Sequence, residues 1–150
     1  MIWKPNVTVA AVIEQDGKFL LVEEQTRYGI LMNQPAGHLE PGESLKEAAA
    51  RETLEESAFH FEPEYLVGIY QWQGHETTYL RFAFGGRILR HDAGRGLDEG
   101  IIRTLWLSRD EIRKEIDRLR SPMVCQCVED YLAGCRYPLD LITHYHKELH

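Results

Sequence analysis

The strongest constraint on this chain lies in residues 37–59, where a turn containing glycine and proline leads into a charged helix. Arg51, Glu52, Glu55 and Glu56 follow one another near the end of that helix. Residues three and four apart share a helix face, so the three glutamates converge and repel one another unless a cation neutralises them. Mg²⁺ and Mn²⁺ prefer oxygen ligands and are commonly held by one or two carboxylates together with substrate phosphates. The segment therefore predicts a site for a divalent cation and a diphosphate.

A solvated helix face is the alternative interpretation of this charged run. Gly37, the Pro41-Gly42 turn and Glu43 precede the run at fixed offsets, however, and a merely solvated face does not require them. We therefore favour the metal site.

The spacing resembles the Nudix box, Gly-x5-Glu-x7-Arg-Glu-U-x-Glu-Glu-x-Gly-U, in which U is a bulky apolar residue. Every charged position of that pattern is filled in this chain. The matching residues are Gly37, Glu43, Arg51, Glu52, Glu55, Glu56 and Phe59.

Two positions depart from the box. Thr53 stands where the family usually has a larger apolar residue, and Ala58 stands where it usually has the glycine that ends the helix. We expect Thr53 to thin the packing under the helix, and Ala58 to be strained if the backbone is left-handed there. Neither residue is a ligand, so the departures concern stability more than chemistry.

Length and composition limit the other possibilities. A chain of 150 residues makes one domain, and we expect residues 1–150 to form a single Nudix hydrolase domain. No apolar stretch is long enough to span a bilayer, and residues 1–5 lack a secretory pattern, which predicts a cytoplasmic protein without a membrane partner. The net charge of -7 argues against nucleic acid as a partner but not against a small phosphorylated substrate, because bound cations invert the local field.

The three cysteines are predicted to be reduced thiols. Cys125, Cys127 and Cys135 are odd in number, and their spacing matches neither a zinc site nor a disulfide framework.

The first half of the chain contains two apolar strand patterns. Residues 7–13 are apolar at alternate and intervening positions, as expected of a strand covered on both faces by helices. The dipeptide Asp16-Gly17 predicts a tight turn, with residues 18–23 as the returning strand of a hairpin. Ser44 and Glu47 form a capping-box pair that starts the box helix.

The second half predicts three further strands and two helices. Residues 65–72 and 77–87 read as a strand pair, with Leu80, Phe82 and Phe84 on one face and Tyr79, Arg81 and Ala83 on the other. A strand at 101–107 precedes a helix that Ser108 caps and that runs to about Leu119. Ser121 and Pro122 start a last helix at 123–133, which Gly134 closes.

The resemblance to the Nudix family implies an α/β fold, an α/β/α sandwich with a mixed central sheet and an additional small antiparallel sheet. Residues 33–40, 120–124 and 133–139 look like the NudJ branch of phosphatases within this family. The resemblance implies a substrate range of thiamine-pathway pyrophosphates and nucleoside di- and triphosphates.

By analogy with the family, Glu52 and Glu56 are metal ligands, Glu55 coordinates directly or through water, and the Gly37 carbonyl completes the set. The expected ion is Mg²⁺, with Mn²⁺ as its substitute. Glu43 and Arg51 hold this arrangement, and Arg51 is interpreted as an orienting partner rather than a substrate clamp.

The identity of the general base stays open, because some family members use a box glutamate and others an acidic residue on a later loop. Glu52 is our first choice. Glu99, with Asp98 beside it, is the loop candidate, and its alternative interpretation is a solvated loop carboxylate.

Aromatic residues on the predicted strands are candidates for binding the organic part of the substrate. Tyr70, Trp72 and Tyr79, with the cation Arg81, lie on strands that can line a cleft, and aromatic side chains stack on flat rings. Core packing is the alternative for each of them. His38 adjoins the box turn and is a candidate for phosphate contact, although a surface or packing role is the simpler interpretation.

Three functional hypotheses follow. The leading one is a magnesium-dependent hydrolase that cuts a phosphoanhydride bond of a nucleotide or a thiamine-type pyrophosphate by means of metal-activated water. The nearest rival is an ADP-ribose or nucleotide-sugar pyrophosphatase. A more distant rival is a non-catalytic module that binds phosphorylated ligands, which the retention of four box glutamates disfavours. Either a monomer or a homodimer is compatible with the chain.

Overall fold

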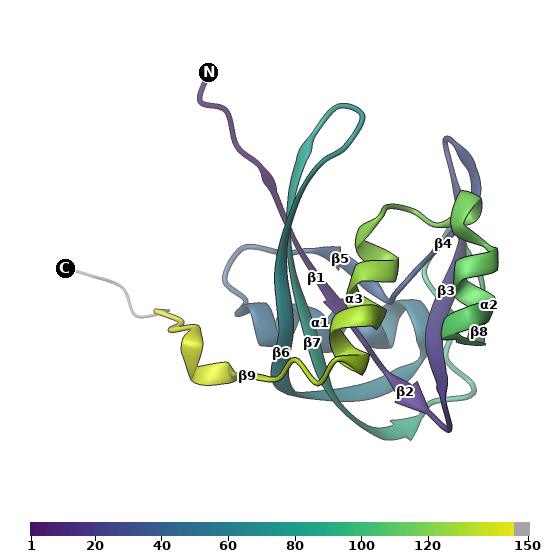
Figure 1. Cartoon of the computed structure of the whole chain (residues 1–150). Coiled ribbons are helices and arrows are strands. Elements are labelled where there is room, and N and C mark those ends of the chain that lie inside the picture. Colours follow the sequence, from purple (N-terminus) through teal and green to yellow (C-terminus); the bar gives the residue numbers. More distant parts are fainter. Residues whose placement is uncertain (146–150) are drawn as a thin grey trace.

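A mixed five-stranded sheet organises the structure, a computed structural model that describes residues 1–145 (Figure 1). Its strands β1 and β7 run parallel, and all other neighbours in this sheet are antiparallel. In spatial order the strands are β5 (Ala36–His38), β1 (Asn6–Ala11), β7 (Thr78–His91), β6 (Phe59–Gln73) and β9 (Tyr137–Pro138).

A second, smaller sheet is antiparallel throughout. Its central strand β3 (Lys18–Thr26) pairs with three other strands: β2 (Glu14–Gln15), β4 (Gly29–Asn33) and β8 (Ile101–Ser108). Helix α2 (Arg109–Lys114) follows β8 directly and packs beside it (Figure 1). A short 3₁₀ helix, η1 (Ile116–Arg118), extends this segment, and a second one, η2 (Leu139–Leu141), follows β9.

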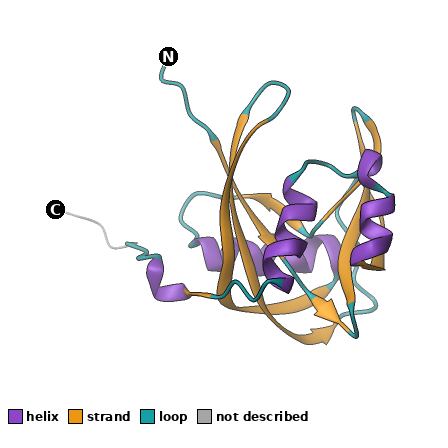
Figure 2. Ribbon diagram, viewed as in Figure 1, coloured by secondary structure: helices purple, strands orange, loops and turns teal. Residues whose placement is uncertain are grey.

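Two helices cover opposite faces of the five-stranded sheet. Helix α1 (Leu45–Ser57) lies behind the sheet and α3 (Met123–Leu132) in front of it in Figures 1 and 2. Alternate residues of β1 divide between the two layers, since Val9 is buried on the α1 side and Ala10 on the α3 side. This arrangement confirms the α/β/α sandwich with an additional antiparallel sheet. None of the helices within residues 1–145 is long and apolar enough to cross a bilayer.

One predicted pairing needs correction. The turn at Asp16-Gly17 does form a hairpin, but the partner of β3 in that hairpin is the two-residue strand β2. Strand β1 belongs to the other sheet, where it pairs with β5 and β7. An apolar pattern identifies a strand but not its neighbour, because pairing depends on contacts distant in sequence.

Several element boundaries also differ from the prediction. Strand β6 begins at Phe59 instead of residue 65, and β7 continues past residue 87 to His91, so the two strands pair over a longer stretch than expected. The helix expected to run from Ser108 to Leu119 ends at Lys114 and continues as η1, although Ser108 caps it as predicted. Helix α3 begins at Met123 as predicted, but it ends at Leu132 and its N-cap is Pro122 instead of Ser121. The Ser121 hydroxyl accepts a hydrogen bond from the Met123 N–H.

The C-terminus of α1 has the strain that its sequence predicts. Ala58 has φ 63° and ψ 14°, a left-handed conformation that glycine adopts without cost. Thr53, the other departure from the box, is fully buried and donates its hydroxyl proton to the Ala49 carbonyl at 2.7 Å. That hydrogen bond satisfies the buried hydroxyl group.

We predict that Ala58→Gly stabilises the protein. Relief of the left-handed conformation is worth about 1–2 kcal/mol, and it exceeds the roughly 0.8 kcal/mol lost with one buried methyl group. The free energy of unfolding should rise by about 0.5–1 kcal/mol, measured by urea denaturation. Ala133→Gly is the matched control, because Ala133 caps α3 with φ −73°. The same substitution there should lower the free energy of unfolding of the protein. Equal effects at the two positions would contradict the prediction.

Candidate active site

Helix α1 starts where the capping box predicts. The Ser44 hydroxyl accepts a hydrogen bond from the Glu47 N–H at 3.0 Å, and the Glu47 carboxylate accepts one from the Ser44 N–H at 2.8 Å. These two bonds satisfy N–H groups that have no partner inside the helix. The start of α1 therefore sets which face carries the box glutamates.

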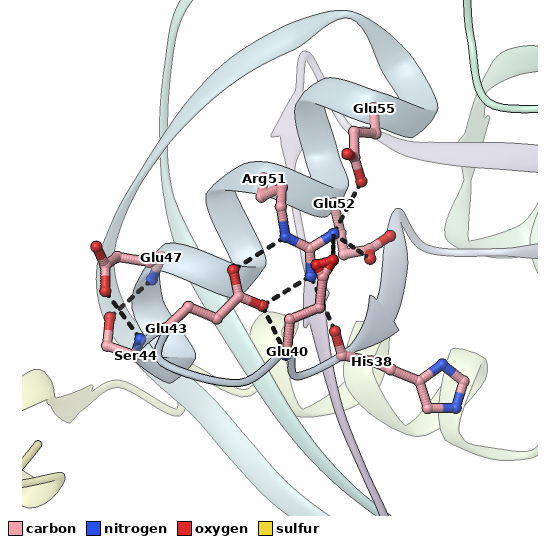
Figure 3. A network of polar contacts seen from close by, with 8 residues as sticks. All are labelled: His38, Glu40, Glu43, Ser44, Glu47, Arg51, Glu52 and Glu55. Atoms are coloured by element: carbon pink, nitrogen blue, oxygen red, sulfur yellow. Dashed lines mark hydrogen bonds and ion pairs between the residues drawn. The ribbon is translucent and has the colours of Figure 1, made fainter. Parts of the chain in front are cut away.

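Arg51 is the centre of the polar network at this site (Figure 3). Its Nε and Nη2 donate to the two oxygens of Glu43 at 2.9 and 2.7 Å, and its Nη1 donates to Glu52 at 2.7 Å and Glu55 at 2.8 Å. Nη2 also donates to the His38 carbonyl at 2.9 Å. Hydrogen bonding to Arg51 lowers the pKa of the Glu43 carboxyl. These contacts are the ones that an orienting role for Arg51 and a supporting role for Glu43 require.

Three carboxylates converge beside this network. Oxygens of Glu52, Glu55 and Asp98 all lie within 4.8 Å of one another. Gly37 faces the same point, since a Cβ added to it would lie 2.1 Å from the Glu52 carboxyl carbon. The close approach of Gly37 leaves no room for a side chain between the β5 backbone and Glu52. A set of carboxylate oxygens next to a close backbone suits a hard divalent cation.

The loop carboxylate of this cluster is Asp98, and Glu99 does not take that position. The Asp98 N–H donates to the Glu55 carbonyl at 2.9 Å, which ties the loop to the end of α1. Glu99 is exposed and does not belong to the cluster. The sequence placed both acidic residues on this loop, but only the backbone conformation determines which of two adjacent side chains faces α1.

Glu56 lies next to the cluster with a distinct environment. Its carboxylate accepts a hydrogen bond from the Ala36 N–H at 3.0 Å, which ties α1 to β5. Burial raises the pKa of Glu56 to about 8, with further contributions from the nearby Glu24 and Glu52 carboxylates. Burial also raises the pKa of Glu52, which the hydrogen bond from Arg51 opposes. The site therefore concentrates negative charge that Arg51 neutralises only in part.

The predicted substrate-binding residues divide into different environments. Arg81 is only 3% exposed, and its Nη1 and Nη2 donate to Gln34 and Asn33 at 2.9 and 2.8 Å. The prediction that Arg81 lines an open cleft is therefore wrong. Tyr70 donates its hydroxyl proton to Asp130 of α3 at 2.7 Å. The Trp72 and Tyr79 rings stack on each other, with centroids 5.6 Å apart.

His38 contributes to the site through its backbone. Its carbonyl accepts from Arg51, whereas its imidazole ring points away from the glutamates (Figure 3). All three cysteines are free thiols, as predicted, and Cys127 on α3 is buried in the core between this helix and the sheet.

The geometry of the box and its fold agree with the known family. The family model of the NUDIX domain matches residues 3–127 of this chain. This chain belongs to the Nudix family. Phosphatase NudJ of Shigella boydii serotype 4 is 43% identical over 141 residues, which cover 93% of this chain and 92% of that protein. Phosphatase NudJ of Escherichia coli K12 is 42% identical with the same coverage. The chain is thus a Nudix hydrolase with NudJ phosphatases among its relatives.

Solved structures agree with this assignment. A NUDIX hydrolase from Nitrosomonas europaea has a TM-score of 0.94 at 57% identity, covering 97% of this chain and 100% of that one. A UDP-X diphosphatase shares the fold with a TM-score of 0.74 at 22% identity, covering 92% of this chain and 68% of that one.

We predict that the metal-free Nudix domain loses stability as pH rises from about 5 to about 8. The Glu56 carboxyl titrates near 4.5 when unfolded and near 8 when folded, so between these values the folded state binds more protons. The free energy of unfolding therefore falls with rising pH, and Glu56→Gln should flatten this dependence. Melting temperatures in the presence of a chelator measure both slopes, and parallel slopes for the two proteins would contradict the prediction.

Proposed function

We propose that this Nudix domain uses a divalent cation to hydrolyse phosphoanhydride bonds in small nucleoside di- and triphosphates or thiamine-type pyrophosphates. The observation that carries the proposal is the convergence of the Glu52, Glu55 and Asp98 carboxylates opposite the backbone of Gly37. The name phosphatase for the NudJ relatives supports the release of phosphate from such compounds. The substrate in this proposal is a small phosphorylated molecule.

The expected cofactor is Mg²⁺, with Mn²⁺ as its substitute. Glu52, Glu55, Glu56 and Asp98 would hold it, with the Gly37 carbonyl as a further oxygen donor. When bound, the cation supplies charge for the phosphate oxygens and lowers the pKa of water. Asp98 takes the place that the sequence suggested for Glu99, because its carboxylate lies in the cluster.

The residues of the chain divide the remaining work. Water oxygen bonds to phosphorus, the phosphoanhydride P–O bond breaks, and the proton of the attacking water passes to a carboxylate. We assign proton acceptance to Glu52, which lies between Gly37, Glu55 and Arg51. Arg51 holds Glu52 and Glu55 in position, and Glu43 holds Arg51 in turn. Fixed carboxylates of this kind lower the cost of reorganisation during the reaction.

Two other activities are outcomes of the same test. An ADP-ribose or nucleotide-sugar pyrophosphatase would use the same box but would need contacts for a second sugar. A binding module would keep the fold without turnover. The relationship to a UDP-X diphosphatase concerns the fold alone at this identity and does not favour the first of these.

We predict release of a single phosphate, dependent on Mg²⁺, from thiamine diphosphate or nucleoside di- and triphosphates. Phosphate and pyrophosphate should be measured separately with Mg²⁺ and with a chelator, using ADP-ribose as the rival substrate. Preference for ADP-ribose would move the protein to the pyrophosphatase class. No turnover of any compound would contradict the proposal and favour a binding module.

We predict that Glu52→Gln and Glu56→Gln each reduce Mg²⁺-dependent turnover by roughly a hundredfold or more. Loss of a residue that supports a metal ligand already costs about 10–100-fold, so loss of a ligand charge should cost at least as much. Glu62→Gln is the matched control, since Glu62 lies on β6 and pairs with Lys46 on the outer side of α1. Wild-type activity in both box variants would refute the assignment of the active site.

A further inference from the structure

The carboxylate site needs a cation for the substrate phosphates, and the two arginines singled out by the sequence are already engaged. Arg51 makes five hydrogen bonds to protein acceptors, which equals the five N–H donors of a guanidinium group. Arg81 is buried and bound to Asn33 and Gln34. Neither side chain is free to bind a phosphate without losing its present partners.

Glu24 is a further carboxylate near the site, on strand β3. On β3 it lies between Leu31 of β4 and Ile101 of β8. Ile101 directly follows the loop that carries Asp98, and the next residue of β3, Gln25, donates its N–H to the Gly100 carbonyl at 2.8 Å. Glu24 is also near enough to Glu56 to raise the pKa of that carboxyl. Strand β3 therefore places a further carboxylate beside the metal-binding residues.

Arg120 contacts Glu24 from the segment between η1 and α3. Its Nη1 donates to the Glu24 carboxylate at 2.5 Å, and its backbone N–H donates to the Met32 carbonyl at 2.8 Å. The Glu24 side chain is 16% exposed and the Arg120 side chain 42% exposed. Among the described residues 1–145, Nε and Nη2 of Arg120 have no hydrogen-bond acceptor. The guanidinium group is thus anchored at one nitrogen and open at the others.

We propose that Arg120 binds a phosphate group of the substrate, and that its single contact to Glu24 keeps that carboxylate from repelling the phosphates. This inference rests on the proposed function and identifies the residue that meets the phosphates. A guanidinium group binds two phosphate oxygens with parallel hydrogen bonds, which a single contact to Glu24 leaves possible. Without Arg120, the Glu24 carboxylate would add to the repulsion between the site and an anionic substrate.

Arg95 is a further cation near the cluster, where it lowers the pKa of Asp98. It belongs to the exposed loop after β7, whereas the backbone of Arg120 is fixed to β4. A fixed donor loses less conformational entropy when it binds a ligand. The structure therefore favours Arg120.

Binding of inorganic pyrophosphate in the presence of Mg²⁺ tests the inference by titration calorimetry. Arg120→Met should weaken binding about tenfold, in line with the loss of a charged hydrogen bond. Glu24→Gln should leave binding unchanged or strengthen it, because it removes a competitor for Arg120 and a negative charge. For the substrate that the wild type hydrolyses fastest, KM should rise in Arg120→Met and should stay unchanged or fall in Glu24→Gln.

The two variants separate phosphate binding from a purely structural ion pair, since both remove the ion pair but only Arg120→Met removes the guanidinium group. Equal weakening by Arg120→Met and Glu24→Gln would overturn the inference, as would unchanged binding in Arg120→Met or weakening confined to Arg95→Met. Arg118→Met is the matched control, because the Arg118 side chain is 43% exposed and pairs with Glu23, the residue before Glu24 on β3. It should bind pyrophosphate as the wild type does. Wild-type binding of pyrophosphate without turnover of any substrate would refute the proposed function but not the role of Arg120.

Discussion

The geometry of the whole site depends on the Arg51 guanidinium group. Its five hydrogen bonds connect Glu43 before α1, Glu52 and Glu55 on α1, and the His38 carbonyl at the end of β5. Carboxylates this close repel one another in the absence of a cation, and a single permanent charge reduces that repulsion while fixing the side chains. All the N–H donors of Arg51 are engaged by these contacts, so its guanidinium group is committed to positioning the surrounding carboxylates.

Arg51 does not contact every carboxyl group of the site. Glu56 and Asp98 receive no hydrogen bond from Arg51, and their pKa values are raised, chiefly by burial. Such a cluster costs folding stability and favours cation binding at once, because a bound divalent ion removes the repulsion. The left-handed Ala58 at the end of the same helix adds a second local cost. Stability and function thus compete within α1, as is common at active sites.

Local patterns in the sequence predicted α1 well, and distant contacts account for most errors. The capping box of Ser44 and Glu47 and the left-handed end at Ala58 depend on residues within a few positions of one another, so the sequence predicts them directly. By contrast, the placement of β1 and β3 in different sheets depends on register with β7 and β8. Alternation also placed Arg81 on a definite face, but its burial results from Gln34 and α3, which periodicity does not report. Asp98 and Glu99 are adjacent acidic residues on a loop, and the sequence has no periodic signal that predicts which of them faces α1.

Arg81 binds the segment that leads into the box turn, at the end opposite to the one that Arg51 binds. Its guanidinium group donates to Asn33 and Gln34, and Gln34 donates in turn to the Val124 carbonyl of α3 at 2.9 Å. Arg51 binds the other end of the same segment at His38. Two arginines therefore fix the backbone on either side of Gly37, one from the sheet and one from α1. A glycine without a side chain needs such external constraints if its carbonyl is to stay in one position, and the contacts of Arg81 with Asn33 and Gln34 supply one of them.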